Sequence, residues 1–308
     1  MNKSSEHSFD SLAALSCIGV LICWVASPLF IKYLTAYLDA WTQNLLRYGA
    51  ASLFWFPFLL ADIKAGRLTK KIWKLALLPF IPNVIMQNFW AFAFYYIDPG
   101  FVTLLVTTSI IWAVILSMIL FKDERQLIKN RRFQISIILC VIGVAGVTLS
   151  NPTLAKSYTI TGIIIVLLYD FVWGFYAIAV KVSMRDIDSR IGFSIISLYT
   201  VAGLAIPALL FGRPEKCLEL STVSWAAVIV SGIIGIGLGH VFYYVSIRRL
   251  GATISSLVLL SQPFAVIVLS YFLFGESLSV LEWVFGIILV AGSALVILSK
   301  RENSLSTI

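Results

Sequence analysis

An acidic residue, Asp170, lies near the middle of a long apolar run of the sequence, residues 160–181. A carboxylate in hydrocarbon costs at least ~2.5 kcal/mol, so an acid at such a position is a functional candidate by default. It can serve as a proton-coupling group or as the counter-ion of a substrate ammonium. The other interpretation is a structural acid that ties helices together through Arg47 or His240. We predict that Asp170 has the functional role, as the residue on which proton coupling or recognition of a charged substrate depends.

The residues that follow Asp170 predict what its helix faces. Trp173, Gly174, Ala177 and Lys181 come three, four, seven and eleven positions later, and these spacings place all of them on one stripe of a helix. A stripe that combines polar and aromatic groups suits a cavity wall better than a lipid-facing surface. We therefore expect Asp170 and Trp173 to line a central cavity.

Two other apolar segments, 75–96 and 225–247, carry polar residues at matching places in the two halves of the chain. Asn83, Gln87 and Trp90 fall on one face of the first, and His240 and Tyr244 on one face of the second. Amides offer both donors and acceptors, which suits a polar or zwitterionic ligand. For His240, a bond to the carbonyl of a neighbouring helix is an equally good interpretation.

The same two segments contain residues that disturb helices. Pro79 and Pro82 are expected to break the first, and the second contains Gly232, Gly235 and Gly239. Paired interruptions of this kind point to the substrate site of a transporter. Close helix packing also explains the glycines, because Gly235 and Gly239 form a GxxxG pair. Both interpretations can hold together.

Further candidates lie elsewhere in the apolar segments. Gln262 precedes a proline in a polar kink of segment 253–274, and Thr103 and Thr107 could line the cavity or bond their own helix backbone. Arg47 is expected to be structural, snorkelling near the outer face or pairing with Asp98. The predicted substrate-binding residues are Trp24, Asn83, Gln87, Trp90, Asp170, Trp173, His240, Tyr244 and Gln262.

The composition shows which elements must position these side chains. Of the 308 residues, 60% are hydrophobic and 12% charged, about half the charged content of a soluble domain. The sequence therefore predicts an all-α integral membrane protein. The ten predicted transmembrane helices are 11–31, 41–61, 75–96, 101–121, 134–150, 160–180, 191–211, 225–247, 253–274 and 280–299. The first is too long for a signal-peptide core, so we expect it to be retained.

The net charge of +8 is explained by orientation and not by nucleic-acid binding. Most of the basic residues fall on the segments that share one side with both termini, which predicts cytoplasmic termini in a cell (inner) membrane. The lipid bilayer and a small-molecule substrate are thus the expected partners. The four cysteines form no CxxC motif or Cys/His cluster, so no metal site, disulfide or cofactor is expected.

A repeat divides the chain. Trp24 and Lys32 recur 149 residues later as Trp173 and Lys181, and Asp39 recurs as Asp188. Each half holds five predicted helices, an odd number, so the second copy is inverted in the membrane. The predicted domains are a tail at 1–10, five-helix repeats at 11–150 and 160–299, an outer linker at 151–159 and a tail at 300–308.

These features together resemble the EamA-type branch of the drug/metabolite transporter superfamily. The resemblance rests on the duplicated Trp and Lys pairs, on Arg47-Tyr48, and on the segments LFKDE at 120–124 and LFGE at 273–276. It implies ten helices, cytoplasmic termini and secondary transport, often export, of amino acids or related metabolites. The chain departs from the pattern at Asp170 and at Gln262-Pro263.

The leading hypothesis is therefore a secondary active transporter, either proton-coupled or of the exchange type, that exports a small metabolite by alternating access. An amino acid or amine is the expected substrate, because the predicted cavity has an acid and no cluster of cations. The alternative is a membrane-embedded enzyme acting on a lipid or isoprenoid substrate, for which Asp186 and Asp188 are an insufficient acidic cluster. A receptor or assembly subunit is disfavoured, since the chain has no soluble domain to relay a signal.

Overall fold

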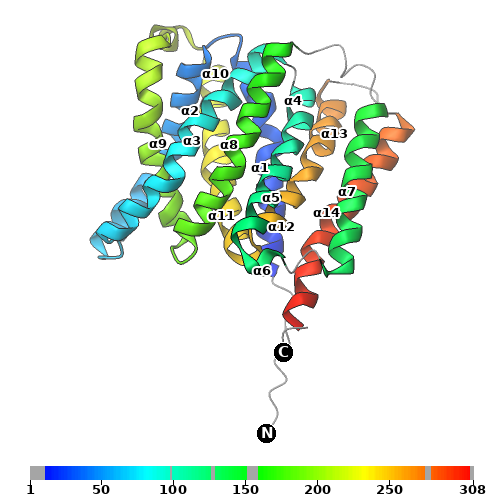
Figure 1. The fold of residues 1–308 in the computed structure, drawn as a ribbon. Helices are drawn as coiled ribbons and strands as arrows, with labels where there is room; N and C mark the ends of the chain where they lie inside the picture. The colour runs from blue at the N-terminus through cyan, green and yellow to red at the C-terminus, as the bar shows by residue number, and fades with distance from the viewer. Residues whose placement is uncertain (1–10, 98, 126–128, 151–158, 275–278, 306–308) are drawn as a thin grey trace.

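The computed structural model is a bundle of helices, and it describes residues 11–97, 99–125, 129–150, 159–274 and 279–305. No strand occurs within these ranges. The first half comprises α1 (Ser11–Leu34), α2 (Ala40–Lys64), α3 (Lys70–Tyr96), α4 (Pro99–Leu105), the 3-10 turn η1 (Val106–Thr108), α5 (Ser109–Leu120), α6 (Lys122–Arg125) and α7 (Arg131–Ser150). These elements are shown in Figure 1.

The second half begins with α8 (Ile160–Met184), α9 (Ser189–Phe211) and the 3-10 helix η4 (Pro214–Glu219). It continues with α10 (Thr222–Val230), the π-helix η5 (Ser231–Leu238) and α11 (Gly239–Leu250). The remaining elements are α12 (Ala252–Val258), the 3-10 turn η6 (Leu259–Ser261), α13 (Gln262–Phe274) and α14 (Val280–Leu305). All ten predicted segments fall on helical residues, apart from Phe121 at the end of the fourth.

Within the described ranges, five helical stretches are long and apolar enough to cross a membrane: Ser11–Leu34, Lys70–Tyr96, Ile160–Met184, Ser189–Phe211 and Thr222–Leu250. Large apolar side chains point outward on the bundle, with Leu209 74% and Ile160 76% exposed. An apolar exterior of this kind suits contact with lipid, since helices satisfy their own backbone hydrogen bonds there. Ten membrane crossings remain a prediction.

The two predicted interruptions have different outcomes. The expected break of the first segment is wrong, because α3 runs without a gap through Pro79 and Pro82. Prolines are tolerated in such helices because neighbouring groups satisfy the freed backbone. The second segment does depart from regular α-helix, since α10 and α11 are joined by the π-helix η5. Short π-helical stretches often occur at functional sites.

The repeated aspartates have a structural role in common. Asp39 caps the start of α2 by accepting a hydrogen bond from Thr42 N, and Asp188 caps α9 by accepting from Arg190 N and Ile191 N. A carboxylate at this position satisfies backbone donors that the helix itself leaves unpaired. The two copies therefore start equivalent helices with the same cap.

Contacts between the halves come in matching pairs. Helix α3 packs on α8, and its counterpart α11 packs on α1; α2 packs on η5 as α3 packs on α9. The equivalent helices α7 and α14 lie side by side at one edge of the bundle (Figure 1). This exchange of partners is what a two-fold relation between repeats requires.

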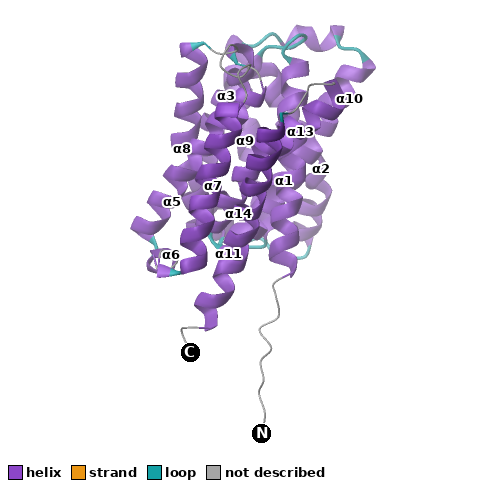
Figure 2. Cartoon of the chain, turned by 90° about the vertical axis from the view of Figure 1, so that its right-hand side faces the viewer, coloured by secondary structure: helices purple, strands orange, loops and turns teal. Residues whose placement is uncertain are grey.

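The helices run along a common direction and their loops gather at the two ends of the bundle (Figure 2). Helix α1 begins and α14 ends at the same end, where the α2–α3 and α8–α9 connections also lie (Figure 1). Those connections carry Arg67 and Arg185. Arg67 and Arg185 thus lie at the end of the bundle where α1 begins and α14 ends, as expected if that end is the more basic one. Which end faces the cytoplasm stays a prediction.

Candidate functional site

A cavity lies between the two halves of the bundle. Its volume is about 50 Å³, which leaves room for more than one water-sized group. Helices from both repeats contribute to its wall. The lining residues are Trp24, Ser27, Arg47, Gln87, Trp90, Thr103, Val106, Thr107, Ser109, Tyr169, Trp173, Gly235, Ile236, His240, Leu259 and Gln262.

Trp24 of α1 is held at the centre of this wall. Its Nε1 donates to the carbonyl oxygen of Gly235 at 2.8 Å, and Gln262 Nε2 donates to the Trp24 carbonyl at 3.0 Å. The indole ring meets that of Trp173 edge to face, with centroids 5.2 Å apart, and lies 5.4 Å from the His240 ring. Elements α1, α8, η5 and α13 therefore meet around one side chain.

Aromatic rings from α3 and α8 continue the wall. Trp90 lies 5.1 Å from Tyr169 between ring centroids, and Tyr169 lies 5.8 Å from Trp173. Rings in these arrangements are attracted beyond the effect of their buried area. The result is a stiff apolar surface along one side of the cavity, suited to an apolar or aromatic part of a ligand.

Arg47 of α2 brings a positive charge into the cavity. Its side chain is buried, with 1% of the residue exposed. Nε donates to Ser231 Oγ at 3.0 Å and Nη2 donates to Ser27 Oγ at 2.9 Å, whereas Nη1 has no hydrogen-bond partner within the described part of the chain. The side chain does not snorkel as expected, and Asp98, its predicted partner, lies outside the described residues.

His240 of α11 also lines the cavity. Its Nδ1 lies 3.0 Å from the carbonyl oxygen of Ile236, one turn earlier in its own helical stretch, and its ring stacks on Phe193 with centroids 5.4 Å apart. Nε2 is buried and makes no hydrogen bond to any residue that the structure describes. The bond to a carbonyl is thus made within its own helical stretch and not to a neighbouring helix, and it leaves the second nitrogen available.

The π-helix places Gly235 against α1 and against the cavity. A Cβ added at Gly235 would lie 3.0 Å from Ser27 Oγ, so a larger residue would push Ser27 aside, and glycine favours the close approach of η5 to α1. Gly235 also lines the cavity and its carbonyl accepts from Trp24. Close packing on α1 is thus shown for this glycine, and its part in a substrate site stays a prediction.

The structure brings six of the nine predicted site residues to this cavity and leaves three away from it. Trp24, Gln87, Trp90, Trp173, His240 and Gln262 line the wall, and Asn83, Asp170 and Tyr244 are not among its lining residues. Asp170 is fully buried next to Tyr169 in the chain. The cavity was expected to hold an acid and no cluster of cations; Asp170 is not among its lining residues, and Arg47 brings a single cation to it.

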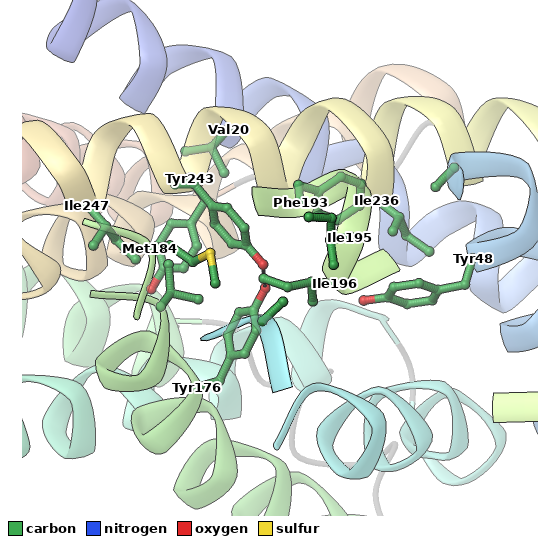
Figure 3. Close-up of a cluster of buried hydrophobic side chains, with 14 of the residues drawn as sticks. Val20, Tyr48, Tyr176, Met184, Phe193, Ile195, Ile196, Ile236, Tyr243 and Ile247 are labelled. Atoms are coloured by element: carbon green, nitrogen blue, oxygen red, sulfur yellow. Dashed lines mark hydrogen bonds between the residues drawn. The ribbon is translucent and has the colours of Figure 1, made fainter. Parts of the chain in front are cut away.

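Asn83 and Tyr244 belong to a buried cluster beside the cavity. Tyr48 donates to Asn83 Oδ1 at 3.2 Å, and Asn83 Nδ2 donates to Thr200 Oγ1 at 2.9 Å, while Tyr244 shares a 2.6 Å hydrogen bond with Tyr176. Tyr48 and Tyr176 enter this cluster from different helices, with their hydroxyl ends turned inward (Figure 3). These polar groups are satisfied by the protein itself.

Sequence reasoning missed Ser27, Ser109 and Tyr169 and assigned Arg47 to structure. A charged residue within an apolar segment is a strong signal, and it would have pointed to Arg47 had its predicted depth been greater. Elsewhere, no group of three His, Cys, Asp or Glu residues that could hold a metal occurs in the part of the chain that the structure describes.

Comparison with known proteins agrees with the repeat. The model of the EamA-like transporter family matches residues 11–149 and again residues 160–298. The chain is 25% identical over 226 residues to "Uncharacterized transporter YdfC" of Bacillus subtilis (strain 168), covering 69% of this chain and 70% of that one. It is 24% identical over 282 residues to an "Uncharacterized transporter" of Clostridium kluyveri, covering 88% of both.

A solved structure titled "Crystal structure of protein" has the same fold. It superposes with a TM-score of 0.73 at 15% sequence identity, over 94% of this chain and 98% of that one. An "Uncharacterized transporter" of Haemophilus influenzae is 23% identical over 194 residues, 62% of each chain.

Proposed function

Because this chain belongs to the EamA-like transporter family, we propose that it is a secondary active transporter that moves a small metabolite across the cell membrane by alternating access. The observation that carries the proposal is the cavity between the two halves, to which both repeats contribute polar and aromatic side chains. In transporters built from inverted repeats, the substrate site lies at the repeat interface.

The lining of the cavity favours an amino acid over a simple amine. Arg47 supplies a cation and suits a carboxylate, whereas Asp170, which was expected to attract an ammonium, is not part of the wall. The rings of Trp90, Tyr169 and Trp173 suit an apolar side chain. Export is the proposed direction, on the strength of the family resemblance, with both termini in the cytoplasm.

Asp170 remains the proposed coupling residue, acting from beside the cavity. It is fully buried and follows Tyr169, whose ring forms part of the wall. A rearrangement of α8 during alternating access would expose the carboxyl to water and let it exchange a proton. The enzyme alternative is disfavoured because the matched relatives are named transporters.

A transport assay with purified protein tests the proposal. Proteoliposomes are loaded with radiolabelled amino acids or amines, and efflux is followed with and without a proton gradient. We expect at least one amino acid to leave the proteoliposomes faster than it leaves equally loaded liposomes without protein. The proton gradient should change the rate of this efflux. Equal efflux rates from liposomes with and without protein, for every compound tested, would refute the proposal.

A further inference from the structure

We propose that Arg47 and His240 form a two-point polar anchor, in which Arg47 Nη1 binds the carboxylate of the substrate and His240 Nε2 accepts from its ammonium group. This inference rests on the proposed transport of an amino acid and adds the residues that recognise its backbone. Both side chains line the same cavity and both present a buried polar atom with no partner in the described part of the chain.

The guanidinium of Arg47 is oriented but not neutralised. The hydroxyl of Ser231 in η5 accepts from Nε, and the hydroxyl of Ser27 in α1 accepts from Nη2. Neither carries a charge, and no ion pair recorded between described residues includes Arg47. A buried cation without a counter-charge is costly, and a carboxylate is the group that a guanidinium binds with matching geometry.

The bond at Nδ1 defines what Nε2 of His240 can do. Its partner is the carbonyl oxygen of Ile236, which can only accept, so Nδ1 carries the hydrogen. In the neutral ring, Nε2 then presents a lone pair and accepts from a donor. Stacking on Phe193 and the bond to Ile236 together fix the direction of this lone pair.

Arg47 supplies a donor and His240 an acceptor, and these match the carboxylate and the ammonium of an α-amino acid. The carboxylate would meet the guanidinium, and the ammonium would meet the imidazole. The aromatic rings of Trp90, Tyr169 and Trp173 then face the side chain of the substrate. The anchor therefore selects apolar α-amino acids, and discriminates against amines that lack the carboxylate.

Binding to the purified full-length protein tests this directly with two matched series. One is phenylalanine, phenethylamine and 3-phenylpropionate; the other is leucine, 3-methylbutylamine and 4-methylpentanoate. Each amine lacks only the carboxylate, and each acid lacks only the ammonium. Dissociation constants measured by calorimetry in detergent should rise by roughly 10- to 100-fold when either group is removed, as expected for lost charge-assisted hydrogen bonds.

Two variants complete the test. Arg47→Gln should weaken the binding of the amino acid and of the matched acid alike, and leave the dissociation constant of the amine unchanged. Arg213→Gln is the control, because Arg213 is an exposed arginine that bonds Asp39 only through its backbone N–H. If Arg47→Gln does not fold, the ranking of the six compounds on the wild-type protein still decides the question.

The outcomes separate the anchor from the transport function. An amino acid that binds more tightly than its amine, with the difference lost in Arg47→Gln, supports the anchor. An amine that binds and is transported as well as its amino acid overturns the anchor and leaves transport standing. If no compound of either series binds or crosses the proteoliposome membrane, the proposed substrate class fails and the anchor fails with it.

Discussion

Trp24 and Trp173 occupy equivalent positions in the two repeats, and their indole rings meet edge to face with centroids 5.2 Å apart. A pair of equivalent residues in contact marks the place where the two repeats face each other. The cavity opens at this contact, since both rings line it. The contact between these equivalent residues and the cavity thus lie at the same place in the bundle.

The two tryptophans differ in their hydrogen bonds, and this difference can be measured. Trp24→Phe removes the donor to the Gly235 carbonyl, and an unsatisfied buried carbonyl costs about 1–3 kcal/mol. Trp173→Phe is the matched control, because the Trp173 indole donates to none of the residues that the structure describes. Thermal unfolding in detergent should therefore show the lower midpoint for Trp24→Phe. Equal midpoints would mean that the bond adds nothing to stability.

Close packing of η5 and α11 on α1 predicts the effect of adding a methyl group. At Gly239 a Cβ would overlap Trp24 Nε1, while at Gly49 nothing lies within 4 Å of an added Cβ. Gly239→Ala should lower the free energy of unfolding by about 1–3 kcal/mol. Gly49→Ala should leave it unchanged or raise it by up to about 1 kcal/mol, since alanine favours helix. A tolerated Gly239→Ala would argue against the close approach of these helices.

An ion-pair cluster joins α2 to α9 at the end where the chain begins. Asp62 is buried and lies 2.9 Å from Arg67 Nη1 and 2.8 Å from Arg190 Nη1. Asp62→Asn removes the acid that both arginines share, leaves Arg190 only a 4.0 Å contact with Asp188, and should cost on the order of 2 kcal/mol. Arg67→Gln removes a 63% exposed partner and should cost at most about 1 kcal/mol. The free energy of unfolding of both variants is measured by chemical denaturation. A larger loss in Arg67→Gln than in Asp62→Asn would show that Asp62 is not the residue on which the cluster depends.

Asp170→Asn tests the coupling proposal. The amide keeps the shape of the side chain and removes its titration, so the variant should fold and reach the membrane. We expect it to lose the response of transport to a proton gradient and to retain exchange of substrate across the membrane. Transport by Asp170→Asn with an unchanged pH profile would show that Asp170 is a structural acid.

Much of the fold could be predicted from the sequence, because apolar length and repeated residues are local signals. Trp24 and Trp173 were paired by spacing alone, and they meet. The helical stripes also indicated that Gln87 and Trp90 share a face, and both line the cavity. Such signals show which side chains share one face of a helix. That is sufficient to predict a contact when the neighbouring helix is the equivalent one in the other repeat.

What the sequence left open depends on which helix each face meets. Asn83 lies one turn from Gln87, yet its amide bonds Tyr48 and Thr200 on other helices. The serine that holds Arg47 Nε, Ser231, is 184 residues away in sequence, and no local pattern predicts that contact. Glycines indicated an interruption near Gly235 but could not specify a π-helix.

Thiol labelling locates the substrate, provided that the native cysteines are first replaced. Cys17, Cys23 and Cys140 are buried, and Cys217 is half-buried in η4. Burial raises the pKa of the Cys217 thiol, so its reaction with maleimide should be slow at pH 7 and accelerate with rising pH as thiolate forms. Cys217→Ser removes this background.

The most direct test of the central claim is substrate protection of a cysteine placed in the cavity. In a cysteine-free background, Gln87→Cys should react with a water-soluble maleimide, and Asn83→Cys, outside the cavity wall, should react far more slowly. A transported amino acid should slow the labelling of Gln87→Cys, with half-protection near its dissociation constant. Labelling of Gln87→Cys at a rate that no transported compound changes would show that the substrate binds elsewhere.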